Sequence, residues 1–447
     1  MKKAVVYLLG VAFAVLAFGA PKEVVIPFKL FKLKNGLTLI LSEDHTAPTY
    51  SIAVVYNVGS RDEKAGRTGF AHLFEHMMFQ GSENVVRGEH MGLIAQNGGS
   101  ENGTTDNDRT LYFETLPANQ LDLGLFLEAD RMGKLAVNQS NLDNQRNAVQ
   151  EERRLRVDNQ PYGKTYEAID DLAFDAFAYK HSVIGSMDDL NAASLQDVQE
   201  FFKRYYAPNN ATIAIVGDFK TDEALAKVKK YFEAIPQQPA PPRPDVSQPE
   251  QKAERRKQLE DQFAQFPRID IVYRIPAGDS PDYYPLSIMS RVLSSGQSSR
   301  LYQKLVKETE VAASASAGTN QRPGPSLEQI SVTVRPGKDL AAVEKLVYDE
   351  VAKLQTQPVE DWEIDKVRMI LRRTQVSGAQ STLNRAANLA ETYAEYGDAN
   401  LVNTEFQKLA AVTKADIMRV AKKYLVETNR SVIVTMPKAR PAGPAGQ

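Results

Sequence analysis

Three features of the sequence predict an α+β fold built from two similar domains. Segments that alternate apolar and polar residues, as strands do, are interspersed with segments of helical periodicity in both halves. A proline-rich stretch separates the halves, and 447 residues exceed the usual size of one domain. The strand-like Val54-Val55-Tyr56, followed by a loop and a helix, is faintly repeated by Ile271-Val272-Tyr273 and the helix predicted at 281–294.

The first domain is predicted at 20–236. It opens with a hairpin, because the turn Asn35-Gly36 lies between two alternating segments. Further strands are predicted at 51–58, 109–116 and 211–216, and helices at 121–135, 140–157 and 221–233. Another helix is predicted from Thr68, a plausible N-cap, to Gln80, and its many apolar residues indicate that it is largely buried.

The second half begins after the proline-rich stretch. Because proline interrupts helices and central strands, 237–260 is predicted to be a linker. The second domain is predicted at 261–437, starting with a strand at 269–273, and the Pro/Gly/Ala-rich tail at 438–447 is predicted to be disordered.

The first 19 residues have the pattern of a signal peptide. Two lysines precede an apolar run at 4–18, and Ala17 and Gly19 are small residues at the positions that favour cleavage before Ala20. The alternative, a membrane anchor, would need a longer apolar run. The chain contains no cysteine, so it forms no disulfide, and export without cysteine suits a bacterial periplasm, with secretion as another possibility.

The charge balance excludes some partners. The 54 basic and 56 acidic residues are well mixed and give a net charge of -2. Nucleic-acid binding would require a basic surface, so we expect none, and we expect no stable membrane anchor after processing.

The segment His72-Leu73-Phe74-Glu75-His76 carries the strongest chemical signal. Residues at i and i+4 of a helix share a face, so both imidazoles can reach one metal ion, and Glu75 at i+3 lies beside them. This order reverses the HExxH motif of metallopeptidases. The other interpretation is a buried helix whose histidines hydrogen-bond to the backbone.

A catalytic zinc has three protein ligands and an open position, so a third donor is needed. The candidates are His45, His90, His181 and many carboxylates. The pair Glu151-Glu152 is favoured by position, because Val149 places Glu152 on the inward face of its helix and turns Glu151 about 100° away. Zinc would lower the pKa of its bound water, and Glu75 would then act as general base in amide hydrolysis.

Several blocks resemble the M16 (pitrilysin-like) metallopeptidases, especially the two-domain branch that includes the mitochondrial processing peptidases. The matching blocks are 59–63, 68–79, 98–105, 110–117, 147–152, 181–185, 206–210, 216–218 and 293–301. The resemblance implies that each domain has a mixed, mostly antiparallel sheet flanked by helices. It also implies that the two domains form half of a clamshell.

The resemblance also assigns residues. It places the third ligand of one Zn²⁺ per chain on Glu152, 76 residues beyond His76. Asn102 and Gly103 match a stretch leading into an edge strand that binds substrate backbone, although Asn102 could equally be a turn residue. His181 matches too, with a structural hydrogen bond as its expected role.

Two departures from the family pattern bear on activity and assembly. Gln145 stands where relatives often have a glutamate that supports the third ligand, so activity could be tuned. Val306 and Ala313 stand where single-chain relatives carry an Arg and a Tyr that grip substrate. We therefore expect a dimer, preferably with a related subunit lacking the metal motif, although a second copy of this chain is also possible.

The function expected from these features is that of an exported zinc endopeptidase that hydrolyses peptides or unfolded polypeptide segments. The alternative is a non-catalytic assembly subunit of the same family. Such subunits characteristically lack an intact metal motif, whereas this chain retains all four polar residues, which are His72, Glu75, His76 and Glu152.

Overall fold

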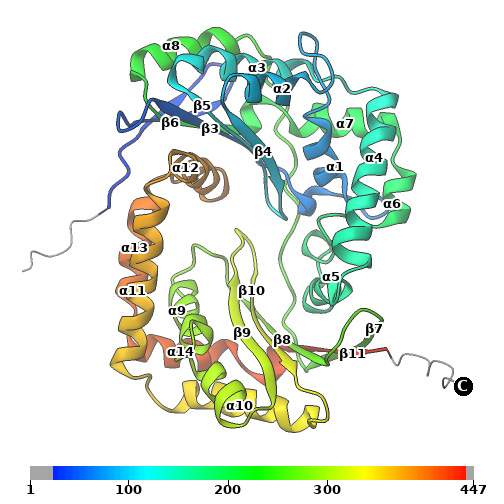
Figure 1. Ribbon diagram of the computed structural model, residues 1–447, viewed down its shortest axis with the longest axis vertical. Helices are drawn as coiled ribbons and strands as arrows, with labels where there is room; N and C mark the ends of the chain where they lie inside the picture. Colours follow the sequence, from blue (N-terminus) through cyan, green and yellow to red (C-terminus); the bar gives the residue numbers. More distant parts are fainter. Residues whose placement is uncertain (1–23, 439–447) are drawn as a thin grey trace, which may run out of the picture.

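The computed structural model describes residues 24–438. It contains two β-sheets, each covered by helices on both faces (Figure 1). In the described residues the first sheet has the order β1-β2-β6-β3-β5-β4 and the second the order β7-β11-β8-β10-β9. The first sheet comprises β1 (Lys29–Lys32), β2 (Thr38–Glu43), β3 (Thr49–Tyr56), β4 (Ser100–Thr105), β5 (Thr110–Pro117) and β6 (Ala211–Gly217). The second comprises β7 (Arg255–Asp261), β8 (Arg268–Ile275), β9 (Ala312–Asn320), β10 (Ser326–Val334) and β11 (Arg430–Pro437).

The two sheets repeat one topology once β1 is set aside. The pairs β2–β6 and β7–β11 are parallel, and every other neighbouring pair is antiparallel. Tyr56 and Tyr273, which belong to the faint sequence repeat, lie on the corresponding strands β3 and β8. The prediction of an α+β fold with two similar, mostly antiparallel domains is therefore confirmed.

The helices also occur in corresponding order. Those of the first half are α1 (Phe70–Met77), α2 (Glu89–Gln96), α3 (Leu121–Lys134), α4 (Gln139–Arg153), α5 (Gly163–Ala173), α6 (Met187–Ala192), α7 (Leu195–Tyr205) and α8 (Thr221–Phe232). Those of the second half are α9 (Tyr283–Ser294), α10 (Leu340–Thr356), α11 (Asp361–Gly378), α12 (Thr382–Tyr396), α13 (Leu401–Ala410) and α14 (Lys414–Tyr424). Most helices predicted for the first half are confirmed to within two residues; helix α4 is continued by a π-helical turn at Arg154–Asp158.

Strand alternation sends successive side chains to two separate cores. On β3, Ile52 and Val54 pack into the core shared with α1, α3, α7 and α8, whereas Ala53 and Val55 face the opposite side. Strand β6 is buried along its whole length because it lies between β2 and β3 and is covered on both faces.

The two halves exchange a helix. Helix α12 of the second half packs on the first sheet, where Ala386, Leu389 and Ala390 join the side chains of β3 and β6 (Figure 1). Reciprocally, α5 of the first half packs on β7, β8 and β11 of the second sheet, burying Ala168 and Ile169. Each sheet thus completes its core with a helix from the other half, which couples the two halves.

An ion pair links the exchanged helix to the first sheet. Arg385 of α12 contacts the carboxylate of Asp44, which follows β2, and both side chains are largely buried. Burial by itself would raise the pKa of Asp44, but hydrogen bonds from Thr46 and Arg385 lower it to about 2.

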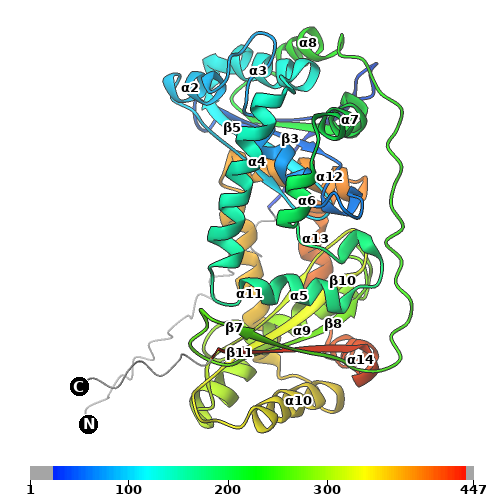
Figure 2. The same ribbon diagram turned by 90° about the vertical axis from the view of Figure 1, so that its right-hand side faces the viewer.

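The predicted linker at 237–260 ends too late. From the end of the first half the chain runs along the outside of the molecule to the second sheet (Figure 2), and β7 already begins at Arg255. This strand was missed because its residues are mostly charged; its backbone is held by parallel pairing with β11 at the sheet edge. The limits 20–236 and 261–437 stay predictions.

The predicted signal peptide, 1–19, lies outside the described residues, as does nearly all of the predicted tail at 438–447. Among the helices that the structure describes, none combines the length and apolar character needed to span a bilayer.

Candidate metal centre

Helix α1 carries the His-Glu-His segment, and the structure shows why it holds a fixed position. Phe70, Leu73, Phe74 and Met77 are buried in the first core. Gly69 adopts φ +87°, and a Cβ there would lie 2.6 Å from the carbonyl oxygen of Ile184. Glycine is therefore required where the chain turns into the helix.

Thr68 is not the N-cap, contrary to the prediction. Gly69 occupies that position, and the carboxylate of the buried Glu63 accepts hydrogen bonds from the backbone of Gly69 (2.9 Å) and Ala71 (2.8 Å). Thr68 instead donates to Asp189. A carboxylate six residues before the N-cap satisfies the free N–H groups and suits the positive end of the helix dipole, and the usual pattern of a capping side chain at the N-cap itself does not reveal it.

His181 supports this cap. Its Nε2 lies 3.0 Å from Glu63 Oε2 and 3.0 Å from the carbonyl oxygen of Ser60. The hydrogen-bonding role expected for His181 is thus what the structure shows. No role was predicted for Glu63 from the sequence, although Glu63 belongs to the block 59–63 that resembles the family. That block was the signal that could have pointed to this capping carboxylate.

The side chains of His72, His76 and Glu152 converge. Glu152, near the end of α4, places its Oε2 3.6 Å from His72 Nε2 and 3.2 Å from His76 Nε2. The two imidazole centroids are 4.9 Å apart. Within the described residues this is one of two groups of histidine and acidic residues whose ligand atoms lie close enough to share an ion.

These distances fit a zinc site. Donors bound to one tetrahedral zinc at roughly 2.0–2.1 Å are separated from one another by about 3.3 Å. The two nitrogen–oxygen separations, 3.2 and 3.6 Å, bracket that value. Two neutral imidazoles and one carboxylate are also a donor set that zinc prefers.

The electrostatics favour the forms that bind metal. Burial, reinforced by the charge of His76, lowers the pKa of His72 to about 4, so its ring is neutral near pH 7. The hydrogen bond with His76 is the main cause that lowers the pKa of Glu152, which keeps that group ionised. Arg156 lies 2.7 Å from Glu152 Oε1, which leaves Oε2 directed at the histidines.

Glu75 is held beside the three donors. Thr105 of β4 donates a hydrogen bond of 2.6 Å to Glu75 Oε2. Burial raises the pKa of Glu75, while the Thr105 bond opposes that rise. A Cβ on Gly103 would lie 2.9 Å from Glu75 Cγ, so the absence of a side chain at Gly103 makes room for this carboxylate.

Asn102 and Gly103 lie on β4, the last strand of the first sheet, which among residues 24–438 is paired on one side only, with β5. Asn102 is exposed, and its Oδ1 accepts a hydrogen bond of 2.8 Å from the backbone N–H of Gly103. The two residues thus lie on a strand next to Glu75.

The remaining candidates lie apart from this centre. His45 pairs with Asp218 at 2.6 Å, and His90 belongs to a second cluster described below. Gln145 is buried on α4 and its amide donates to Asn144 Oδ1 at 2.7 Å. Glu151 is exposed and pairs with Arg154, as its predicted outward orientation requires.

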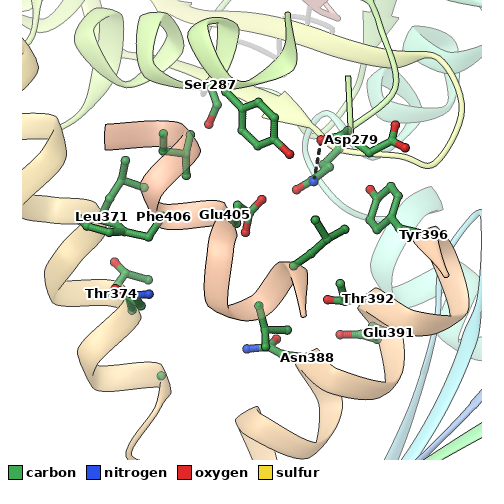
Figure 3. A pocket seen from close by; sticks show the side chains of 18 of the residues that line it. Asp279, Ser287, Leu371, Thr374, Asn388, Glu391, Thr392, Tyr396, Glu405 and Phe406 are labelled. Atoms are coloured by element: carbon green, nitrogen blue, oxygen red, sulfur yellow. Dashed lines mark hydrogen bonds between the residues drawn. The ribbon is translucent and has the colours of Figure 1, made fainter. Parts of the chain in front are cut away.

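A cavity of about 720 Å³ lies in the second half among α9, α11, α12 and α13 (Figure 3). Its lining includes the acidic residues Glu391, Glu395 and Glu405, and burial together with neighbouring carboxylates raises the pKa of Glu395 to about 8. None of the three converging donors lines it. Glu391 nevertheless pairs at 2.7 Å with Arg109, which donates to Thr104 of β4, so Arg109 connects one lining residue of the cavity to the edge strand.

Comparison with known proteins agrees with this geometry. The family model described as insulinase (peptidase family M16) matches residues 38–185, and the model described as the peptidase M16 inactive domain matches residues 192–371. The chain belongs to peptidase family M16. The first match contains His72, Glu75, His76 and Glu152, and the second lies entirely after His181, the last histidine of the sequence.

Similar proteins of about the same length are known. The zinc protease PqqE of Helicobacter pylori is 29% identical over 411 residues, which cover 91% of this chain and 92% of that protein. The probable mitochondrial-processing peptidase subunit beta of Arabidopsis thaliana is 23% identical, covering 91% of this chain and 77% of its own. The crystal structure of a protease from Helicobacter pylori matches with a TM-score of 0.88 at 28% identity, covering 92% of this chain and all of that one.

Proposed function

We propose that this chain is an exported zinc endopeptidase that hydrolyses peptides or unfolded polypeptide segments. The observation that carries the proposal is the convergence of His72, His76 and Glu152, with Glu75 beside them. Membership in a peptidase family and the names of the zinc proteases to which the chain is similar support it.

His72, His76 and Glu152 would hold one zinc ion per chain. When bound by these three side chains, zinc would supply Lewis-acid chemistry for the hydrolysis of a peptide bond. Glu75 accepts the proton of the attacking water and passes it to the leaving amine nitrogen. Thr105 fixes the carboxylate of Glu75 through its 2.6 Å hydrogen bond, so the base does not need to reorient during the reaction.

The substrate would bind as an additional strand on β4. In the part of the chain that the structure describes, β4 is paired only with β5, so its other edge can form backbone hydrogen bonds with an extended peptide near Asn102 and Gly103. Backbone recognition selects extended segments, because the backbone of a folded domain is already engaged in its own hydrogen bonds. Peptides and unfolded chains are therefore the expected substrates.

The sequence also supports a proposal about where the protein acts and how it assembles. With no cysteine in the chain, the proposed signal peptide at 1–19 would deliver it to the periplasm or the exterior in a form that needs no disulfide. We further propose that it acts as a dimer, preferably with a metal-free relative, because Val306 and Ala313 replace the substrate-gripping pair of single-chain relatives. A fully active monomer on a sizing column would exclude this assembly.

The function is tested by digesting a mixed peptide library, with and without a chelator, and identifying the products by mass spectrometry. We expect cleavage that the chelator abolishes and that added Zn²⁺ restores. Glu75→Gln should bind zinc normally but lose cleavage by at least about 100-fold, the contribution typical of a general base. The matched control Glu151→Gln alters an exposed carboxylate one helix away and should be fully active. Normal cleavage by Glu75→Gln would refute the assigned mechanism.

A further inference from the structure

A second cluster of potential metal ligands lies among α2, α3 and β5. His90 of α2, Glu114 of β5 and Glu128 of α3 offer ligand atoms that all lie within 4.8 Å of one another. Their side chains lie on the α3-covered side of the first sheet, because Glu114 points to the same face of β5 as the core residues Tyr112 and Leu116. All three are at most 3% exposed.

Several polar atoms of this cluster lack partners within the described part of the chain. Neither carboxylate oxygen of Glu114 has a hydrogen-bond partner, nor does His90 Nε2. Oε2 of Glu101 is also buried and unpartnered. Buried polar groups without partners are strongly unfavourable, so the arrangement requires a ligand or a change of ionisation.

Strand register adds to the electrostatic imbalance. Glu101 of β4 and Glu114 of β5 are directly opposite each other in the sheet. Like charges at opposed positions repel unless something between them compensates. The chain therefore places two carboxyl groups together, and among the described residues neither forms an ion pair or hydrogen bond with a basic side chain, although the nearby charge of Arg131 acts on both.

One basic side chain, that of Arg131, lies at the cluster and forms an ion pair with Glu128. Arg131 donates from Nε to Glu128 Oε2 at 2.9 Å and its Nη2 contacts the other oxygen. Its guanidinium stacks on the ring of Tyr112, with 4.6 Å to the centroid. After this pairing the charges of Glu101 and Glu114 remain, and these two negative charges equal the charge of one divalent cation.

The remaining groups are suited to a metal. Burial lowers the pKa of His90 to about 2, so its imidazole is neutral and can donate a lone pair. Carboxylate oxygens have more than one lone pair, so Glu128 can bind a metal while it accepts from Arg131. Imidazole with carboxylates suits first-row divalent ions such as Zn²⁺ and Mn²⁺.

We propose that His90, Glu114 and Glu128 bind a second divalent transition-metal ion, with Glu101 as an additional ligand. The ion is structural, because the site is buried and does not adjoin Glu75. It would join α2, α3 and β5 behind Tyr112, whose ring packs against Gly103 of the edge strand. Without metal, a proton on Glu114 would have to remove the excess charge, since burial and the charge of Glu128 raise the pKa of Glu114 far above its usual value.

The test is the number of metal ions per chain. The full-length protein and its variants are stripped with chelator, reloaded separately with Zn²⁺, Mn²⁺ or Co²⁺, desalted and analysed by mass spectrometry for metals. We expect about two ions per chain for the unaltered protein with at least one of these metals, and about one for the double variant H72A/H76A. Because that variant lacks the first site, this result is independent of peptidase activity and separates the two proposals.

Glu114→Gln identifies the second site. It should lower the count by about one ion in both backgrounds, because an amide is a much weaker ligand for these ions than a carboxylate. The matched control is Glu328→Gln: Glu328 is also fully buried with both oxygens unpartnered, but it lies in the second sheet outside both ligand clusters. The number of metal ions per chain in Glu328→Gln should equal that of the unaltered protein. One ion in the unaltered protein and none in H72A/H76A would overturn the proposal, as would a count that Glu114→Gln does not alter.

Discussion

Replacing Gly103 by alanine tests the position of the Glu75 carboxylate without substituting any polar residue. Gly103 lies on the edge strand β4, and the added Cβ would be 2.9 Å from Glu75 Cγ and 3.3 Å from Tyr112 Cδ1. Carbon atoms in contact are normally about 3.5–4.0 Å apart, so the glutamate side chain must move by about 0.6–1 Å. Tyr112 is fully buried and cannot move away, so the displacement falls on Glu75.

A displacement of this size should lower kcat/KM by about 10-fold to 100-fold, because errors of about 1 Å in a reacting group can reduce rates by two orders of magnitude. The three atoms nearest to the added Cβ belong to Glu75 and Tyr112 and not to the proposed zinc ligands, so zinc content should stay at its normal value. The loss should appear mainly in kcat, since the base acts in the chemical step.

The assay is hydrolysis of a fluorogenic peptide derived from a library cleavage site, together with zinc analysis of the same sample. Gly318→Ala is the matched control: it lies on β9, the corresponding edge strand of the second sheet, and its Cβ would meet no atom within 4 Å. Unchanged kcat for Gly103→Ala, or an equal loss for both variants, would refute the proposed position of the base.

Three further predictions concern the ligand, the exchanged helix and pH. Glu152→Ala should lose zinc and activity while Glu151→Ala retains both, and zinc analysis showing the reverse would reassign the ligand. Leu389→Ala should lower the free energy of unfolding by about 2–5 kcal/mol in urea titrations, because this fully buried side chain joins α12 to the first sheet; a change under about 1 kcal/mol would contradict that packing. Asp44→Asn should destabilise by about 2 kcal/mol at neutral pH, because the folded pKa of Asp44 is lowered to about 2 beside Arg385. Since the depressed pKa stabilises the fold above the unfolded value near 4, the difference from the unaltered protein should shrink as pH falls towards 2, and a constant difference would contradict the ion pair.

Much of the site was predictable because it is local. His72, Glu75 and His76 share one face of any helix formed by their segment, whatever surrounds it. Glu152 was different, because its own helix indicated only that it faces inward. Glu152 lies 76 positions after His76, two strands and two helices separate α1 from α4, and only the packing of these elements brings Glu152 Oε2 to 3.2 Å from His76 Nε2.

Strands were predictable where alternation was strong and missed where it was weak. The hairpin at Asn35-Gly36 and strands β3, β5 and β6 followed from their apolar pattern. Strand β4, with the sequence Ser-Glu-Asn-Gly-Thr-Thr, and the charged β7 have little apolar content, and pairing with a neighbour rather than side-chain burial keeps them in their sheets. The N-cap prediction at Thr68 failed because the N-cap is Gly69 and the capping carboxylate belongs to Glu63, six residues earlier, rather than to a residue at the cap itself.

The sequence by itself determined the chemistry of the helix that carries the two histidines, the α+β composition and the presence of two similar halves. Only the tertiary structure decided which sheet each amphipathic helix covers, and it places α5 and α12 on the sheets of the opposite halves. The physical reason is that helical periodicity defines an apolar face but carries no information about its partner. That choice depends on which exposed sheet face the chain can reach and bury.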